Sequence, residues 1–354
     1  MEPKEVNCII VGGGLAGSCL ALQLLAEGRN FVMFDQPHKN RSTAIAAGLF
    51  NPITSKVMTK TWMADRLFDS LFAFYQQAAQ QTGVDFFHPA AVYRPFVSVE
   101  EQNEWMARSS EPAIQPFVGH VAAASLYGHQ VHDRHGGLLL NRCGYLDTRM
   151  FMEAVRALAL RLNRYVEAPF AYQDLQVEPA PVYRGWRARW VIFCEGTSVR
   201  ENHWFNWLPV QPLKGETLEV TTHERLELIY NRGVYVVPAT KGSYRVGATY
   251  QRSREEGCTN EGRAELEDKL SALLRVPFRV VSQDWGHRPT VSDRKPILGA
   301  HPKHANLVAF NGLGTKGVSL APHFSGVLAR WLRGVGQIEK DVNISRFYAL
   351  YSKF

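Results

Sequence analysis

The hydrophobic positions near the N-terminus predict a strand, a helix and a second strand. Residues 6–11 form a short apolar run with β-branched side chains, which is typical of a buried strand. Residues 16–27 have the composition of a helix, and Gly28 follows as a C-terminal stop. A second apolar run, residues 30–34, closes on Asp35. This order of elements predicts a right-handed parallel crossover.

In the later segments, the spacing of hydrophobic residues is typical of helices in some and of strands in others. Residues 63–81 carry apolar side chains on one helical face, and residues 147–163 predict a helix with Asp147 as N-cap. A last helix is expected at residues 319–332. Turn residues among the β-rich segments between 218 and 250 favour an antiparallel sheet. Strands are expected at residues 164–170, 190–194, 218–222, 234–238, 244–250 and 307–310.

Composition and charge exclude several functional classes. The chain has 354 residues, 45% of them hydrophobic, and a formal net charge of +7 that is spread along the chain. It has no run of five or more basic residues and no segment apolar enough to span a bilayer. The five cysteines form no C-x-x-C pair, and the histidines show no H-E-x-x-H spacing. We therefore expect a cytoplasmic protein without a metal site, a membrane anchor or a nucleic-acid partner.

A glycine-rich turn after the first strand predicts a dinucleotide site. Gly12, Gly14 and Gly17 form the pattern G-x-G-x-x-G, and Asp35 closes the second strand eighteen residues later. Glycine lets backbone amides approach a pyrophosphate, and the following helix directs its positive N-terminal end toward it. Asp35 is placed to accept a hydrogen bond from a ribose hydroxyl, and its charge opposes the 2′-phosphate of NADP.

Residues 12–35 together with the small-residue segment 42–48 resemble the D-amino-acid oxidase superfamily, which includes glycine oxidase and sarcosine oxidase. The resemblance implies that residues 42–48 lie against the pyrophosphate and flavin of FAD. It also implies that the strand at 164–167 contacts adenine, and that residues 194–196 form a second FAD-binding turn. Family members usually have two small residues before the glycine of that turn, and Glu195 departs from this pattern. The implied cofactor-binding residues are Gly12, Gly14, Leu15, Ala16, Gly17, Asp35, Ser42, Thr43, Ala47, Gly48, Val166, Cys194, Gly196, Gly312, Gly314, Thr315 and Lys316.

The C-terminal third carries the most specific part of the resemblance. Residues 285–289 and 293–299 are similar to the glycine-oxidase segment that holds the substrate-carboxylate arginine, and residues 311–317 resemble the turn under the flavin. A guanidinium fork matches the two oxygens of a carboxylate. Residues 233–238 and 246–250 resemble two strands of the substrate domain. The implied catalytic residues are Arg288, Lys316, Tyr235 and Tyr250.

Each of these four residues has an alternative role that the sequence leaves open. Arg288 could form a structural ion pair with Asp284 or Asp293. Lys316 could be a solvated surface lysine. The two tyrosines could serve ordinary strand packing, which tyrosine favours.

The resemblance implies an FAD-dependent oxidoreductase that oxidises the C–N bond of a small amino acid or N-substituted amino acid by hydride transfer to flavin N5. Oxygen or another electron acceptor would reoxidise the flavin. We expect non-covalent FAD, because Cys258, the only cysteine after Cys194, lies outside the matching segments. Two alternatives stay open: a tRNA wobble-uridine-modifying flavoenzyme, and a flavin-binding protein without amine oxidase activity.

The expected fold class is α/β, with a Rossmann-like FAD-binding domain and an interleaved antiparallel-sheet substrate domain. We assign residues 1–85, 140–213 and 284–354 to the FAD-binding domain, and residues 86–139 and 214–283 to the substrate domain. Residues 86–139 show no recognisable chemistry.

Overall fold

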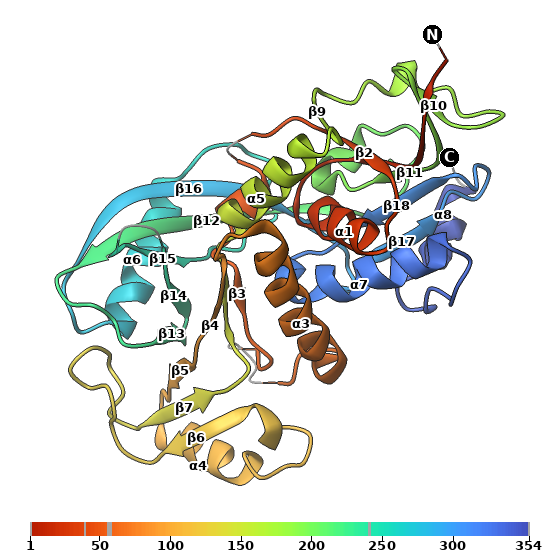
Figure 1. The fold of residues 1–354 in the computed structure, drawn as a ribbon. Coiled ribbons are helices and arrows are strands. Elements are labelled where there is room, and N and C mark those ends of the chain that lie inside the picture. The colour runs from red at the N-terminus through yellow and green to blue at the C-terminus, as the bar shows by residue number, and fades with distance from the viewer. Residues whose placement is uncertain (1, 39, 55–58, 240–241, 353–354) are drawn as a thin grey trace.

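Two large β-sheets organise the chain, and each draws its strands from distant parts of the sequence (Figure 1). The computed structural model describes residues 2–38, 40–54, 59–239 and 242–352. A small third sheet lies between the two large ones in Figure 1. Its strands, in spatial order, are β3 (Leu49–Phe50), β8 (Gly144–Leu146) and β4 (Phe87–Pro89).

The first large sheet is mostly parallel and resembles a dinucleotide-binding sheet. In spatial order its strands are β17 (Ile297–Ala300), β18 (Leu307–Asn311), β11 (Trp186–Phe193), β1 (Lys4–Val11), β2 (Phe31–Asp35) and β9 (Tyr165–Glu167). Only β17 and the short β10 (Val182–Tyr183) pair antiparallel with their neighbours. Central β1 is apolar on both faces, since Cys8 and Ile10 belong to one hydrophobic cluster and Ile9 and Val11 to another.

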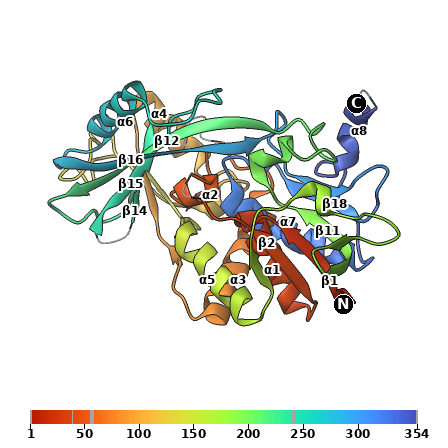
Figure 2. The same ribbon diagram turned by 90° about the horizontal axis from the view of Figure 1, so that it is seen from above.

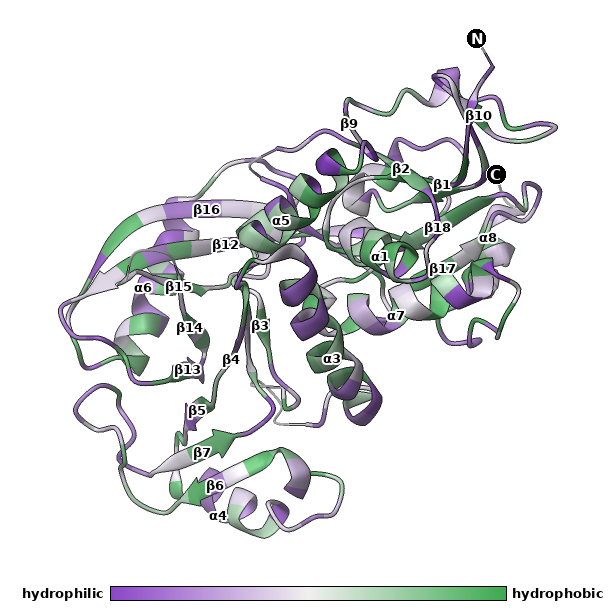
Figure 3. Cartoon of the chain, in the orientation of Figure 1, coloured by the Kyte–Doolittle hydropathy of each residue, from purple (hydrophilic) through white to green (hydrophobic). Residues whose placement is uncertain are grey.

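Three helices pack on one face of this sheet: α1 (Leu15–Ala26), α5 (Thr148–Arg161) and α7 (Gly317–Leu332). A fourth helix, α3 (Ala64–Thr82), packs against α7 and α5. Helices α1 and α7 lie side by side (Figure 1). Hydrophobic and hydrophilic bands alternate along α3 in Figure 3, because its apolar residues recur at helical spacing and face the core. The Asp147 carboxylate accepts a hydrogen bond from the Met150 amide at 3.0 Å, which confirms the predicted N-cap of α5.

The second large sheet has eight strands and is antiparallel except for one pair. In spatial order they are β16 (Phe278–Thr290), β12 (Gln211–Thr222), β15 (Tyr244–Gly247), β14 (Val234–Pro238), β13 (Ile229–Arg232), β5 (Val92–Pro95), β7 (Gly137–Leu140) and β6 (Val118–Ala122). The parallel pair is β13 with β5. Helix α6 (Asn260–Leu273) covers one face through Leu266 and Leu270, and α4 (Val99–Arg108) lies near β6 (Figure 1).

The short helix α2 (Ser42–Ile45) lies where the two large sheets meet (Figure 2). A bridge between Arg41 and His287 joins the residue before α2 to β16. A Cβ at Gly286 would stand 3.1 Å from the Asn40 carbonyl oxygen and 3.2 Å from the Ile45 side chain. The segment around α2 therefore covers the face of β16 on which residue 286 lies, and this contact brings the dinucleotide turn to the second sheet.

The α/β class, with a Rossmann-like sheet and a second, mostly antiparallel sheet, is confirmed. Two predicted strands are too long, since β9 ends at Glu167 and β15 ends at Gly247. The small-residue segment 42–48 begins with α2, and β3 follows it. β12 and β16 pass without a break through residues 214 and 284, where the domain limits are expected, and the division into domains stays a prediction.

Candidate active site

Of the three glycines in the G-x-G-x-x-G pattern between β1 and α1, two are crowded and one is open. Gly12 has φ +98°, and a Cβ there would stand 2.6 Å from the Cys194 carbonyl oxygen. A Cβ at Gly17 would stand 2.0 Å from the Gly12 carbonyl oxygen. At Gly14, the N-cap of α1, a Cβ would meet only the Thr43 hydroxyl, at 3.6 Å. The N-terminal end of α1 is therefore open at Gly14, as a bound anion requires.

Asp35 connects the end of β2 to this turn. Its buried carboxylate accepts a hydrogen bond from the Gly13 amide at 2.8 Å and pairs with the Arg41 guanidinium at 2.7 Å. The Tyr165 hydroxyl donates to its other oxygen at 3.1 Å. Asp35 thus supports the glycine turn in addition to the ribose contact expected from the sequence.

The segment 42–48 lies beside the same turn. The Thr43 hydroxyl accepts a hydrogen bond from the Leu15 amide at 3.3 Å. Gly48 has φ +72°, and a Cβ there would stand 1.8 Å from the Leu146 carbonyl oxygen, so this position requires glycine. Ser42 and Ala47 lie in this segment, partly buried. The structure therefore brings this predicted cofactor segment to the N-terminus of α1.

Two arginines that the sequence analysis missed hold the segment in place. The Arg245 Nη1 atom donates to the carbonyl oxygens of Ala44, Ile45 and Ala46 at 3.3, 3.4 and 3.1 Å. The Arg149 Nε atom donates to the Ala44 carbonyl oxygen at 2.7 Å. Burial lowers the pKa of Arg245 below its usual range. Only the pairing of β14, β15 and β12 brings Arg245 to this segment, so no local sequence signal identifies it.

The turn after β18 brings four other elements together. The Gly314 amide donates to the Pro289 carbonyl oxygen on β16 at 3.0 Å. The Asn311 side chain donates to the Gly196 carbonyl oxygen after β11 at 2.8 Å. A Cβ at Gly317, the first residue of α7, would stand 3.0 Å from the Leu15 side chain of α1. The N-termini of α1 and α7 are therefore neighbours.

The other predicted cofactor residues border this region. Gly312 and Gly314 adopt φ +73° and +56°, and Thr315 is exposed. Ala16 is buried in the first turn of α1. Val166 pairs with Phe34 on β2, next to Asp35.

Glu195 is a partly buried carboxyl group to which the sequence analysis gave no role. The Tyr172 hydroxyl and the Asn202 amide donate to its two oxygens at 2.7 and 2.9 Å. Burial raises the pKa of Glu195 to about 7, and these two hydrogen bonds oppose the shift. Its Cα lies 3.6 Å from where a Gly12 Cβ would stand, so its backbone borders the dinucleotide turn.

Arg288 lies on β16 without an acidic partner among the residues that the structure describes. The two predicted partners are occupied elsewhere, because Asp284 contacts Arg149 at 3.4 Å and Asp293 contacts Arg346 at 2.9 Å. The structural ion pair considered for Arg288 is therefore absent. Its guanidinium instead donates to a backbone carbonyl oxygen and lies 4.8 Å from the centre of the Tyr250 ring.

Tyr235 shares the face of the sheet that carries Arg288. A Cβ at Gly247 would stand 2.5 Å from the Tyr235 hydroxyl, so this side chain lies across β15 toward β12. Burial raises the pKa of Tyr235 to about 12, and the nearby Arg288 charge opposes the shift. Tyr250 lies beyond the end of β15 and is 63% exposed, which contradicts the alternative of ordinary strand packing for this residue. Tyr235 and Tyr250 therefore both approach Arg288.

Lys316 lies in the turn that precedes α7. Its Nζ atom contacts the Thr61 hydroxyl at 2.7 Å. Burial lowers the pKa of Lys316 to about 8, and the Arg294 charge adds to the shift. Lys316 is partly buried, which contradicts the alternative of a solvated surface lysine.

No group of three or more His, Cys, Asp or Glu side chains within the described ranges could hold a metal ion. In the same ranges, no helix is both long and apolar enough to cross a bilayer. Cys258 is exposed, and its Sγ atom contacts the Gln283 carbonyl oxygen at 3.4 Å. Gln283 lies on the sheet face opposite to the one that carries Arg288. Non-covalent binding of FAD stays a prediction.

A family model described as FAD dependent oxidoreductase matches residues 7–331 of the chain. The chain belongs to this family. The resemblance to the D-amino-acid oxidase superfamily is thereby confirmed, and with it the FAD cofactor. The protein is a flavin-dependent oxidoreductase.

Curated relatives of this family member differ in length. A glycine oxidase of Bacillus subtilis is 23% identical, with 96% of this chain and 95% of that protein covered. A bifunctional protein ThiO/ThiG of Trichormus variabilis is 24% identical, with 98% of this chain and 55% of that protein covered. The tRNA 5-methylaminomethyl-2-thiouridine biosynthesis bifunctional protein MnmC of Shewanella halifaxensis is 19% identical, with 94% and 60% covered. The chain thus spans little more than half of the two bifunctional relatives.

A solved structure supports the fold. The crystal structure of iminodiacetate oxidase from Chelativorans sp. BNC1 has a TM-score of 0.76 at 18% identity, with 94% of this chain and 97% of that chain covered. At this identity the likeness establishes the fold alone.

The residues of the glycine turn fit FAD. The open end of α1 at Gly14 leaves room for a pyrophosphate, because no side chain fills the space where a Cβ would stand. Thr43 and the neighbouring N-terminus of α7 complete the surroundings of that space with polar groups. Gly14, Thr43 and Asp35 would therefore hold the dinucleotide.

We expect Asp35→Ala to weaken FAD binding by about 1–3 kcal/mol, the usual effect of losing a hydrogen bond to a charged group. FAD fluorescence quenching on titration of the apoprotein measures this change. Asp35→Asn keeps an acceptor for the Gly13 amide, so it separates support of the turn from the ribose contact. Unchanged FAD affinity in Asp35→Ala would remove this residue from the cofactor site.

Proposed function

We propose that the protein oxidises the C–N bond of a small amino acid or N-substituted amino acid. The guanidinium of Arg288, which has no acidic partner among the described residues, carries this proposal. A buried or half-buried arginine is normally paired, because removing its charge from water is costly. A substrate carboxylate would supply the missing partner in a bidentate geometry.

The position of Arg288 relative to the cofactor segment supports the same function. Side chains along a strand point alternately to its two faces, so residues 286 and 288 lie on the same face of β16. The segment around α2 covers that face at Gly286. Arg245 lies on this face too and holds the carbonyl groups of residues 44–46. A carboxylate on Arg288 would therefore lie beside the segment that we expect to contact the flavin.

Each candidate residue has a defined task in this proposal. Arg288 binds the carboxylate, and the Tyr250 ring limits the movement of its guanidinium. The Tyr235 hydroxyl, protonated at neutral pH, can donate a hydrogen bond to a substrate oxygen. Lys316 adds positive charge from the α7 turn and is mostly protonated below about pH 8. When bound, FAD supplies a two-electron acceptor for the hydride of the α-carbon.

Two features of the comparisons support a small amino acid. The relative named glycine oxidase covers almost the whole chain, and the iminodiacetate oxidase shares its fold. Both names describe compounds with an amine and a nearby carboxylate. In the proposed function, Arg288 binds the carboxylate of such a compound.

A second candidate, oxidation of a modified tRNA base, is supported by the similarity to MnmC over 94% of this chain. Its substrate would also present a C–N bond to the flavin. The two candidates differ in the size of the substrate and in the need for a nucleic-acid surface.

Anaerobic bleaching of the bound flavin tests the proposal without knowledge of the natural electron acceptor. We expect at least one of glycine, sarcosine, alanine and proline to bleach the flavin. Methylamine and dimethylamine, which lack the carboxylate of glycine and sarcosine, serve as matched controls and should not. Equal bleaching by the controls would contradict carboxylate recognition, and bleaching only by tRNA with a substituted wobble uridine would favour the second candidate.

A further inference from the structure

The tip of the Arg288 side chain lies against the backbone of β12 at Gly215. A Cβ at Gly215 would stand 2.2 Å from both Nη atoms of Arg288 and 2.4 Å from its Cζ atom. Real Cβ atoms essentially never approach another heavy atom so closely. The observed position of the guanidinium therefore requires a residue without a side chain at this point of the strand.

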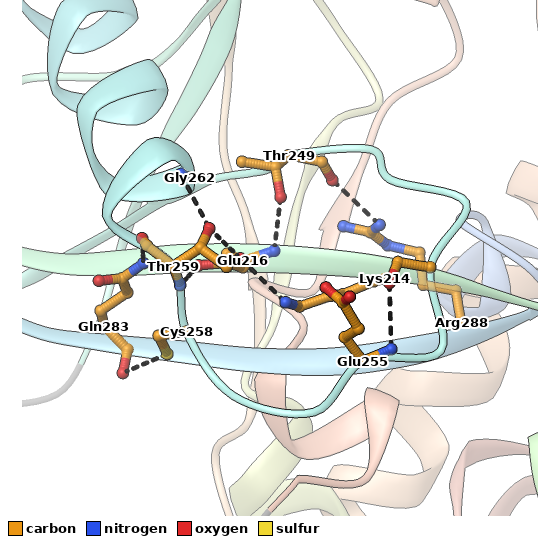
Figure 4. A network of polar contacts seen from close by, with 10 residues as sticks. Lys214, Glu216, Thr249, Glu255, Cys258, Thr259, Gly262, Gln283 and Arg288 are labelled. Carbon is orange, nitrogen blue, oxygen red and sulfur yellow. Dashed lines mark hydrogen bonds and ion pairs between the residues drawn. The ribbon is translucent and has the colours of Figure 1, made fainter.

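Thr249 fixes the same guanidinium from another side. Its carbonyl oxygen accepts a hydrogen bond from the Arg288 Nη1 atom at 3.3 Å. Its hydroxyl accepts from the Glu216 amide at 2.9 Å, and its own amide donates to the Glu216 carbonyl oxygen at 3.2 Å. Figure 4 shows Thr249 between Glu216 and Arg288, in contact with both. The orientation of the Thr249 carbonyl thus depends on these two bonds to β12.

Glu216 itself is held rigidly on the opposite face of β12. Its side chain is fully buried and lies 3.3 Å from the Lys214 ammonium. One of its carboxylate oxygens accepts from the Thr259 amide at 2.9 Å, and the other accepts from the Thr259 hydroxyl at 2.9 Å. The Gln283 amide donates to it as well, at 2.5 Å. These contacts give β12 a fixed support behind the site.

We propose that Gly215 and Thr249 are positioning residues that fix the Arg288 guanidinium for recognition of a substrate carboxylate. Gly215 leaves the space that the guanidinium tip occupies, and Thr249 orients one of its N–H groups. One N–H bonds to Thr249, and the other donors of the fork, which have no acceptor among the described residues, remain for the ligand. This inference rests on the proposed role of Arg288, and it adds two residues that touch neither substrate nor cofactor.

The first test uses Gly215→Ala in the FAD-loaded protein. A methyl group at this position displaces the guanidinium by roughly 1 Å, and a displacement of this size can cost about a hundredfold in a positioned site. We expect the Kd of benzoate, measured from the flavin difference spectrum, to rise at least about tenfold. The KM of an accepted amino acid should rise similarly, with kcat and FAD affinity little changed.

A double-mutant cycle separates positioning from a general structural role. If Gly215 acts through Arg288, then Gly215→Ala should cause no further loss in the flavin reduction rate divided by the substrate Kd when it is added to Arg288→Ala. A second pair of variants, Thr249→Val and Thr249→Ser, tests the inference independently of Gly215→Ala. The valine variant loses the hydroxyl that accepts from Glu216, and we expect a severalfold weaker benzoate response that the serine variant restores.

The outcomes distinguish this inference from the proposed function. If Arg288→Ala leaves the benzoate response unchanged, the proposed role of Arg288 is wrong, and this inference fails with it. If Arg288→Ala abolishes the response while Gly215→Ala and Thr249→Val retain the wild-type Kd, only the positioning role is wrong. Equal losses in the flavin reduction rate divided by the substrate Kd from Gly215→Ala in the presence and absence of Arg288 would also overturn it.

Discussion

Arg288→Ala should retain FAD and the fold. The ratio of its flavin reduction rate to the substrate Kd should fall about a hundredfold. Removing one partner of a hydrogen-bonded charge pair typically costs about 2–5 kcal/mol, and 3 kcal/mol is roughly a hundredfold. Arg288→Lys should also lose affinity, because an ammonium is a point charge without the planar fork. Anaerobic stopped-flow mixing with an amino acid that bleaches the flavin measures both variants.

Arg279→Ala is a matched control for this prediction. Arg279 is exposed on the same strand, β16, and its removal lowers the net charge by the same amount. We expect the control to keep the wild-type reduction rate and Kd. A loss of FAD or of the fold in Arg288→Ala would show a structural role for this residue, although the two acids considered as its partners pair with other arginines.

Gly14→Ala and Gly17→Ala should affect FAD binding for different reasons. A Cβ at Gly14 meets only the Thr43 hydroxyl, at 3.6 Å, so the apoprotein should fold normally. The same Cβ would occupy the space needed by the pyrophosphate, and we expect FAD affinity to fall at least about tenfold, or roughly 1.4 kcal/mol. At Gly17 the Cβ would stand 2.0 Å from the Gly12 carbonyl oxygen. Forcing α1 away from β1 should destabilise the apoprotein by about 1–3 kcal/mol in addition to weakening FAD.

Thermal unfolding of the apoproteins and FAD titration separate the two effects. The Gly14→Ala apoprotein should unfold within a few degrees of the wild type, since alanine for glycine at an N-cap costs less than about 1 kcal/mol. The Gly17→Ala apoprotein should unfold at a clearly lower temperature. Wild-type FAD affinity in Gly14→Ala would place the pyrophosphate elsewhere.

The sequence was sufficient for those parts of the site that depend on neighbours along the chain. The glycine turn and Asp35 follow from one strand–helix–strand unit, in which sequence spacing determines which groups meet. The N-cap of α5 also depends only on residues that are close in the sequence. Arg288 and Lys316 were identified only through resemblance to a family, because an arginine or lysine alone has many roles.

The remaining part of the site depends on strand pairing between distant segments. Gly215, Arg245 and Thr249 approach Arg288 or the cofactor segment only because β12 pairs with both β15 and β16. Gly215 did carry a signal, since a glycine inside a strand often marks a close approach of another group. That signal does not identify which group approaches.

Two missed elements have different causes. β16 is partly buried along most of its length and carries polar side chains on both faces, so no clean alternation predicts a strand. Helix α6 does have buried leucines at helical spacing, Leu266, Leu270 and Leu273, and this pattern could have predicted it. Most residues between these leucines are polar or charged, and they obscured the helical spacing of the leucines.

The central claim is that Arg288 binds a carboxylate beside the flavin, and a ligand titration tests it without a known substrate. Benzoate and acetate, added to the FAD-loaded wild-type protein, should produce a saturable difference spectrum of the flavin. The same additions should leave the spectrum of folded, FAD-loaded Arg288→Ala unchanged. A saturable response of equal amplitude and Kd in the two proteins would contradict the claim and would place the carboxylate site elsewhere.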